Sequence, residues 1–118
     1  MANPTTKKTV NLTKISAAFN EAVAKHPKLC DQLINPKTDW SWLELMQKHV
    51  NDVSAPPYYG ENIFLEEFAE AMNAYQLGHK EDAVNELAQC CAVILRMMQY
   101  VEDEMERENK NGHTGDKE

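Results

Sequence analysis

The chain has 118 residues, 42% of them hydrophobic, which matches one ordinary domain with a modest core. Its formal net charge of −7 disfavours a nucleic-acid backbone or an anionic membrane as the principal partner, because either would repel the chain's average field. This charge does not exclude a nucleotide, because a metal ion can bridge acidic side chains and a polyphosphate.

The spacing of the cysteines and the hydropathy of the chain indicate in which cellular compartment we expect the protein. Cys30, Cys90 and Cys91 lack the spacing of a zinc site or of a disulfide framework, which favours a reducing environment. No segment is apolar enough for a membrane span, and the N-terminal residues have no apolar core typical of a signal peptide. We therefore expect a cytoplasmic protein. Cys90 and Cys91 lie in an apolar helical run, where we expect them to be small buried residues rather than nucleophiles.

The ends of the chain differ in composition from the part between them. Residues 1–10 and 109–118 are polar and lack periodicity, which predicts flexible tails. Residues 11–108 show helical periodicity and no strand alternation of useful length. The predicted fold class is all-α, a single domain built as a bundle of about four helices.

The first two helices are predicted over residues 12–25 and 40–53, separated by a loop. Asp39 or Ser41 can cap the second helix, and Glu44 completes a possible capping box with Ser41. Apolar residues repeat at helical spacing in both segments, which predicts one apolar face on each helix. These residues are Ile15, Phe19, Ala22, Val23, Trp42, Leu45, Met46 and Val50.

Two further helices are predicted after the helix-breaking stretch SAPPYYG. The third covers residues 61–77, and Gly78 stands where a C-terminal cap glycine belongs. The fourth begins near Lys80 and continues to Glu106. Its last part, EDEMERE, has no apolar companion face and is expected to be solvated.

Acidic side chains are concentrated on the third and fourth helices. Glu66, Glu67 and Glu70 form an EExxE motif, in which residues three and four apart are neighbours on the helix surface. Across the Gly78 turn, Asp82 and Glu86 are four apart on one face of the next helix. An antiparallel helix pair could bring the two rows together around a hard cation such as Mg²⁺, which prefers oxygen ligands. The alternative interpretation is an ordinary solvated acidic face.

The segments NIFLEEFAEAMNAYQ and EDAVNELAQCCAVILRMMQYVE resemble the MazG-like all-alpha nucleoside triphosphate pyrophosphohydrolases. The motif of that superfamily is EExxE on one helix and ExxD on the next. Glu66, Glu67 and Glu70 match its first half, and Glu86 matches the glutamate of its second half. Gln89 stands in place of the aspartate, and ELAQCCAV is similar to a phage and prophage branch that carries ELxQ.

The resemblance implies a helical bundle that is a homo-oligomer, either dimer or tetramer. It also implies hydrolysis of a nucleoside triphosphate to a monophosphate and pyrophosphate, with Mg²⁺ or Mn²⁺ as the cofactor. The implied metal-binding set is Glu66, Glu67, Glu70, Glu86 and Gln89. Glu67 is the candidate catalytic residue, although the motif does not separate ligand from base. A second hypothesis is an inactive MazG-like protein that binds a nucleotide or a protein partner, and a third is a purely structural oligomer.

Overall fold

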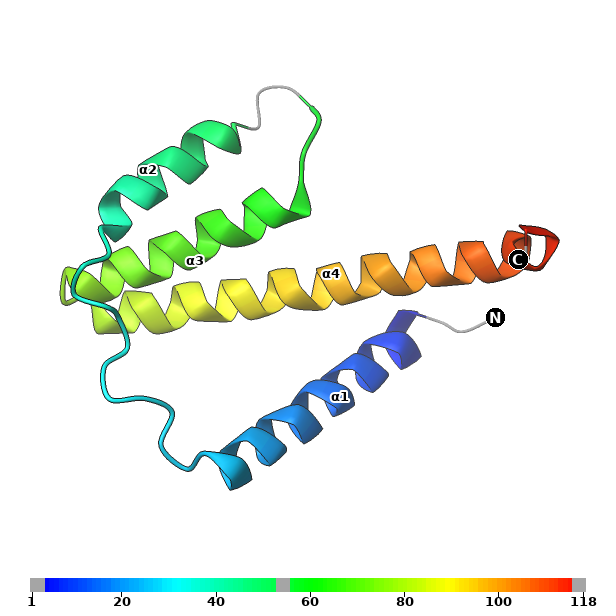
Figure 1. Cartoon of the computed structure of the whole chain (residues 1–118), viewed down its shortest axis with the longest axis horizontal. Coiled ribbons are helices and arrows are strands. Elements are labelled where there is room, and N and C mark those ends of the chain that lie inside the picture. The colour runs from blue at the N-terminus through cyan, green and yellow to red at the C-terminus, as the bar shows by residue number, and fades with distance from the viewer. Residues whose placement is uncertain (1–3, 53–55, 116–118) are drawn as a thin grey trace. The chain divides into compact units, whose positions relative to one another are not determined.

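The computed structural model of the chain describes residues 4–52 and 56–115, with burial defined for residues 11–52 and 56–110. Within those residues it contains four α-helices and no strand, which confirms the all-helical prediction (Figure 1). The helices are α1 (Pro4–Lys25), α2 (Trp40–Val50), α3 (Gly60–Gln76) and α4 (Lys80–Gly115). No helix within the described residues is long and apolar enough to cross a membrane.

Helix boundaries differ most from the prediction at the two ends of the chain. α1 begins at Pro4 instead of Leu12, and α4 continues beyond Glu106 to Gly115. Helix therefore enters both predicted tails, although the residues there, PTTKKTV and NKNGHTG, include few strong helix formers. The predicted tail residues 1–3 and 116–118, and Val53 at the predicted end of the second helix, lie outside the described residues.

Residue contacts divide the chain into two compact units. The central unit, Cys30–Ile94, contains α2, α3 and the first part of α4. The terminal unit consists of residues up to Leu29 and from Leu95 onward, and contains α1 and the second part of α4. The single domain over 11–108 stays a prediction.

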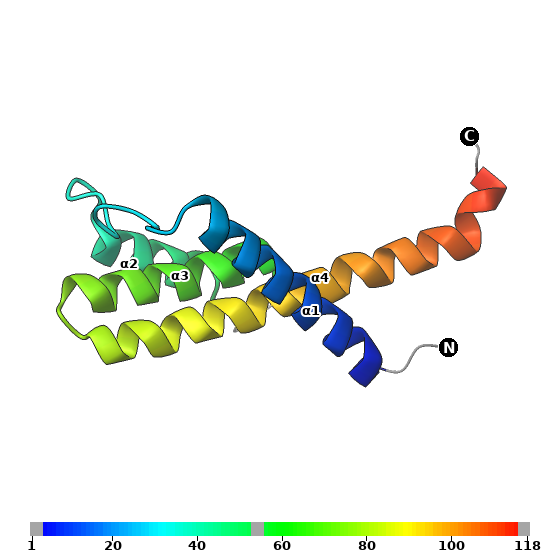
Figure 2. The same ribbon diagram turned by 90° about the horizontal axis from the view of Figure 1, so that it is seen from below.

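In the central unit, α3 lies between α2 and the first part of α4, and Figures 1 and 2 both show α3 alongside α4. Aromatic rings join α2 to α3, because the Trp40 ring contacts the Phe68 ring edge-on at 5.3 Å between centroids. The Phe64 and Phe68 rings are stacked at 6.0 Å. Small side chains dominate the buried apolar core, which lets helix backbones approach closely. These core residues are Ala69, Ala71, Met72, Ala83 and Cys90.

The orientation of α2 differs from the predicted one. Trp42, Leu45 and Val50 of the predicted apolar face are exposed. The cap is Asp39, whose carboxylate accepts hydrogen bonds from the Ser41 hydroxyl at 2.7 Å and the Trp42 amide at 3.3 Å. These bonds, the Ser41 bond foremost, lower the pKa of Asp39.

Polar side chains of α2 contact α3, and Met46 is the one half-buried member of the predicted apolar stripe. The Asn62 amide donates to Gln47 at 3.3 Å, and the Asn73 amide donates to the Glu44 carboxylate. The predicted capping box of Glu44 with Ser41 is therefore wrong, because the Glu44 carboxylate is bonded across the helix interface. Helix amphipathicity alone could not predict this rotation, since the polar contacts depend on residues 15 to 29 positions away.

The turn between α3 and α4 depends on Gly78, as the sequence predicts. Gly78 has φ of +84°, and its amide donates to the Tyr75 carbonyl at 3.0 Å. The His79 amide donates to the Ala74 carbonyl at 2.9 Å, which completes a Schellman motif. The chain thereby reverses direction within two residues, so α3 and α4 run antiparallel.

Replacing Gly78 with alanine is expected to lower the free energy of unfolding by about 1–2 kcal/mol, because an L residue is strained in the left-handed region. A Cβ atom at this position would meet no atom within 4 Å, so steric overlap adds nothing to this effect. Urea unfolding followed by circular dichroism measures the difference. A Gly78→Asn variant is the matched control and should lose less, since asparagine tolerates positive φ. Equal losses for both variants would contradict this account.

In the terminal unit, one side chain of α4 joins the two helices. The Asn11 amide, which is buried, donates to the Glu102 carboxylate at 3.3 Å. The Lys14 ammonium lies 3.6 Å from the same carboxylate. The prediction that EDEMERE is wholly solvated is therefore wrong for Glu102, which is half-buried because α1 supplies it with a donor and a cation.

Candidate metal centre

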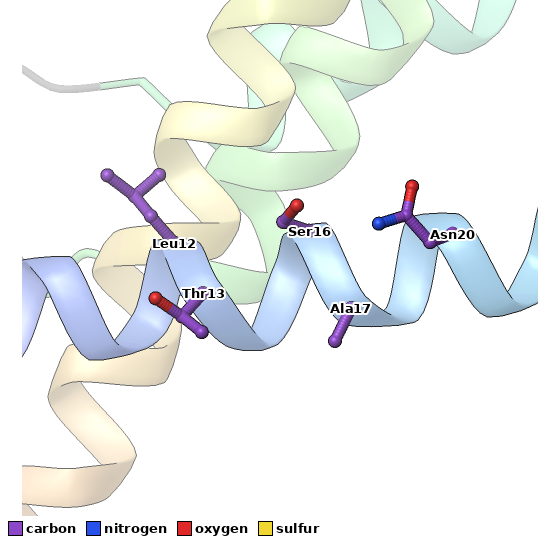
Figure 3. A pocket seen from close by; sticks show the side chains of 5 residues that line it. All are labelled: Leu12, Thr13, Ser16, Ala17 and Asn20. Carbon is purple, nitrogen blue, oxygen red and sulfur yellow. The ribbon is translucent and has the colours of Figure 1, made fainter.

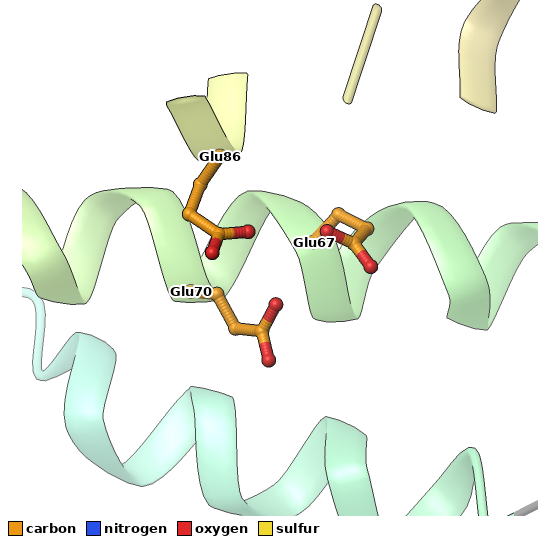
Figure 4. Close-up of side chains that lie close together, drawn as sticks. All are labelled: Glu67, Glu70 and Glu86. Atoms are coloured by element: carbon orange, nitrogen blue, oxygen red, sulfur yellow. The ribbon is translucent and has the colours of Figure 1, made fainter. Parts of the chain in front are cut away.

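Three carboxylates of the central unit converge at the interface of α3 and α4. Glu67 and Glu70 extend from α3 and Glu86 extends from α4, with one oxygen of each within 4.8 Å of the others (Figure 4). All three side chains are half-buried. We call these residues the acidic trio. Three formal negative charges thus share a small, partly desolvated space.

Local structure explains how the acidic trio forms. Glu67 and Glu70 are three residues apart on α3, so their side chains leave the helix on the same side. The Gly78 turn then sends α4 back along α3 and brings Glu86 opposite them. Ala71 and Ala83 are buried at 0% and 3% exposure, and their small side chains permit the close helix approach.

The electrostatics of the acidic trio favour protonation or cation binding. Burial, followed by the charges of Glu67 and Glu86, raises the pKa of Glu70 to about 7. Burial, followed by the neighbouring Glu86 carboxylate, also raises the pKa of Glu67. Partial desolvation and like charges both disfavour the ionised form. A group that brings positive charge into this space would therefore be stabilised.

One lysine partly neutralises the acidic trio from α2. The Lys48 ammonium lies 2.7 Å from the Glu44 carboxylate and 3.7 Å from that of Glu70. The hydrogen bond to Glu44 is the main cause that raises the pKa of Lys48. Among the described residues, no lysine, arginine or histidine forms an ion pair within 4.0 Å of Glu67 or Glu86. Most of the negative charge therefore has no cation beside it in this part of the chain.

Two members of the metal-binding set named from the sequence lie outside the acidic trio. The Glu66 carboxylate accepts a hydrogen bond of 2.6 Å from the Asn51 amide, so it serves the contact between α2 and α3. Gln89 is exposed on α4. The structure thus brings together Glu67, Glu70 and Glu86, and gives Glu66 a different partner.

An open pocket of 230 Å³ adjoins the acidic trio within the central unit. It is smaller than the range of about 300–1,000 Å³ common for small-molecule sites, so it suits a compact polar group such as a phosphate better than a whole nucleotide. Polar groups from all three helices of the unit line it. The lining residues are Glu44, Glu70, Asn73, Ala74, Leu77, His79, Asp82 and Glu86.

Sequence reasoning did not identify the contribution of α2 to this region. Glu44 and Lys48 of α2 and Asn51, its C-terminal cap, form one polar row. Their partners on α3 are Asn73, Glu70 and Glu66. The spacing of Glu44 and Lys48, four residues apart, is a common surface ion pair and gave no indication of a site. Only the packing of α2 against α3 reveals their position.

Cys90, whose pKa is influenced by Glu67 and Glu86 of the acidic trio, is not a second reactive group. Cys90 is buried, and burial, followed by the charge of Glu67, raises the pKa of its thiol to about 11. Its expected role as a small buried apolar residue is confirmed, because a protonated thiol is a poor nucleophile. The same expectation is wrong for Cys91, which is exposed because the next residue of a helix points about 100° away.

The donor set indicates what the acidic trio can bind. Carboxylate oxygens are hard ligands, and Mg²⁺ or Mn²⁺ binds such oxygens together with water and substrate phosphate. Two helices already hold three donors, so little conformational entropy remains to be lost on binding. Comparison of the chain with protein-family models, with curated proteins and with solved structures found no match.

Proposed function

We propose that the acidic trio binds Mg²⁺ or Mn²⁺ and that the protein is a MazG-like, metal-dependent nucleotide pyrophosphohydrolase. Its reaction is hydrolysis of a nucleoside triphosphate to a monophosphate and pyrophosphate. The observation that carries the proposal is the convergence of Glu67, Glu70 and Glu86 within 4.8 Å. The EExxE motif and the glutamate of the following helix support it from the sequence.

Each member of the acidic trio has a defined part in this proposal. Glu70 and Glu86 hold the ion, because their carboxylates face each other across two helices. Glu67 is assigned as the general base from its place in the EExxE motif, and burial and the charge of Glu86 raise its pKa. When bound, the divalent ion supplies positive charge that offsets the charge of the phosphate oxygens.

Lys48 supports the same reaction from α2. Its ammonium lies 3.7 Å from Glu70, and the adjoining pocket is wide enough for a phosphate group. A lysine can bind phosphate as a point charge. Lys48 therefore orients a phosphate next to the acidic trio, while Asn73 and His79 line the pocket.

One observation favours a second function, binding of a nucleotide without hydrolysis. Gln89 replaces the motif aspartate, and a glutamine supplies a neutral oxygen in place of a negative charge. The acidic trio would then hold the ion and the nucleotide, but more weakly than a complete motif. This second function retains the scaffold and the ligand and differs only in turnover.

Pyrophosphate release and calorimetry distinguish these functions. The protein is incubated with each nucleoside triphosphate and Mg²⁺, and binding of Mg²⁺ and nucleotide is titrated in parallel. A Glu70→Gln variant should lose Mg²⁺ binding and turnover, because it removes one charged donor of the acidic trio. A Glu61→Gln variant is the matched control, since Glu61 lies on the same helix, is exposed and is outside the acidic trio.

Each function predicts a different combination of binding and turnover. Turnover that Glu70→Gln abolishes and Glu61→Gln retains supports the enzyme. Binding of Mg²⁺ and nucleotide without turnover supports the second function. Wild-type protein that binds no divalent cation contradicts both functions and leaves a purely structural helical protein.

A further inference from the structure

Two pockets of the chain differ in the charge of the side chains that line them. A pocket of 420 Å³ along α1 is lined by uncharged residues only, which are Leu12, Thr13, Ser16, Ala17 and Asn20 (Figure 3). The pocket beside the acidic trio is lined by four carboxylates and by no lysine or arginine. Of these two pockets, only the second offers charged partners to a cation.

Lys48 of α2 forms ion pairs with two of the carboxylates that line this second pocket. Its ammonium lies 2.7 Å from the Glu44 carboxylate and 3.7 Å from the Glu70 carboxylate. The first distance is that of a charge-assisted hydrogen bond, and the second is too long for one. Glu44 is therefore the primary partner of Lys48. The ammonium can leave Glu70 and keep its bond to Glu44.

The position of Glu44 is fixed by α3. Its carboxylate accepts a hydrogen bond from the Asn73 amide, and its side chain is only 18% exposed. Glu44 and Lys48 are four residues apart on α2, so their side chains lie on the same face. The residues Glu44, Lys48, Glu70 and Asn73 all belong to the central unit. The packing of α2 against α3 therefore holds the ammonium beside the acidic trio.

One ammonium does not neutralise the acidic trio. Burial, followed by the charges of Glu67 and Glu86, raises the pKa of Glu70 to about 7. The charge of Lys48 acts in the opposite direction but is outweighed. A divalent cation at the acidic trio would thus meet negative charge that is still uncompensated, and it would also be repelled by the ammonium 3.7 Å from Glu70. The two cations would share one carboxylate.

We propose that Lys48 is a built-in counter-cation of the acidic trio, which competes with a divalent cation for Glu70 and lowers the metal affinity of the site. This inference rests on the proposed function, because it takes the acidic trio as the metal site. With the ion bound, Lys48 keeps its bond to Glu44 and is released from Glu70. The released ammonium pairs with a phosphate next to the ion, so metal and phosphate each strengthen the binding of the other.

Calorimetric titration of the full chain with Mg²⁺ at pH 8 tests the competition, because Glu70 is mostly ionised above its pKa of about 7. Lys48→Met should bind Mg²⁺ about 2–5-fold more tightly than wild type, since the side chain of Lys48 is 48% exposed and solvent screens its ion pair. Lys48→Arg keeps the charge and should restore the wild-type affinity. Lys37→Met is the matched control and should not change the affinity, because it removes the same charge from an exposed residue of the same unit.

Glu44→Gln should have the opposite effect on Mg²⁺ affinity. Without its primary partner, Lys48 pairs more fully with Glu70, and the affinity should fall about 2–5-fold. If the Lys48–Glu44 pair served folding alone, both substitutions would lower the affinity, so opposite signs identify competition. An increase in ionic strength from about 0.01 M to about 1 M should shrink the difference between Lys48→Met and wild type, because the Debye length falls from about 30 Å to about 3 Å.

Inorganic phosphate tests the pairing of Lys48 with phosphate. The Mg²⁺ titration is repeated with the same phosphate concentration in the cell and in the syringe. The Mg²⁺ affinity of the wild type should then rise by a larger factor than that of Lys48→Met, because only the wild type has an ammonium to release. An equal rise in both proteins, or no rise in either, overturns this pairing.

The Mg²⁺ titrations distinguish failure of this inference from failure of the proposed function. A wild type that binds Mg²⁺, together with a Lys48→Met chain that binds it no more tightly, overturns the competition and leaves the proposed function standing. If neither protein binds Mg²⁺, the proposed function and the inference both fail. Binding by Lys48→Met alone supports the competition and contradicts the proposed function.

Discussion

Glu70→Gln is expected to raise the free energy of unfolding in metal-free buffer by about 1–3 kcal/mol at pH 8, with little effect at pH 4. The folded pKa of Glu70 is about 7, raised from an ordinary value of 4.5 by burial and by Glu67 and Glu86. Between these values the folded chain holds a proton that the unfolded chain has lost. The stability that this proton confers is complete below pH 4.5 and is lost as the pH rises through 7, and glutamine removes this loss.

Urea unfolding at pH 4, 6 and 8 measures the difference between variant and wild type. Glu61→Gln is again the control, and its difference from wild type should not change with pH because Glu61 is exposed on the same helix. A Glu70→Gln chain that is less stable than wild type at pH 8 would contradict this expectation. It would show that the ion pair with Lys48 stabilises the ionised Glu70 more than burial and the neighbouring carboxylates destabilise it. Under the proposed function, adding Mg²⁺ at pH 8 stabilises the wild type by mass action and leaves the variant unchanged.

Met72→Ala is expected to lower the free energy of unfolding by about 2–4 kcal/mol, the cost of a cavity left by a truncated core side chain. Met72 is 3% exposed, and the other buried apolar residues of the described chain are three alanines and a cysteine. Met72 is therefore the largest of these buried apolar side chains, and its truncation removes more buried apolar volume than that of any other. Because Met72 lies on α3 between Glu70 and the Gly78 turn, the same change should also weaken Mg²⁺ binding.

Val84→Ala is the matched control for this core substitution. Val84 is exposed, so its truncation should change stability by no more than about 0.5 kcal/mol. Chemical denaturation of both variants, followed by circular dichroism, gives the comparison. Equal losses in the two variants would mean that the core of the central unit lies elsewhere.

The local part of the fold could be predicted because its signals lie within a few residues of each other. The third helix was expected over residues 61–77 and is observed over Gly60–Gln76. Gly78 follows it with the positive φ that its position in a C-terminal cap requires. Asp39 caps α2 through bonds to Ser41 and Trp42, which are two and three residues away. Such features depend on backbone geometry that the neighbouring residues alone determine.

The orientation of helices could not be predicted in the same way. α2 turns Glu44 and Lys48 toward α3 and leaves Leu45 exposed, contrary to its apolar spacing. That orientation involves contacts with distant residues, which are the Trp40–Phe68 ring contact and the side-chain hydrogen bonds to α3. The apolar spacing within α2 carries no information about these partners. Ile15, Phe19 and Val23 of α1 follow the predicted apolar spacing but are exposed.

The amino-acid sequence by itself determined that this protein is helical, that its chain reverses at Gly78, and that carboxylates lie on both sides of that reversal. The tertiary structure alone decided which carboxylates meet. Glu86 joins Glu67 and Glu70 because two antiparallel helices pack at alanines, whereas Glu66, one residue from Glu67, is bonded to Asn51, the C-terminal cap of α2. The physical reason is that a side chain's direction follows from its own helix, while its partners depend on how separate helices pack against each other.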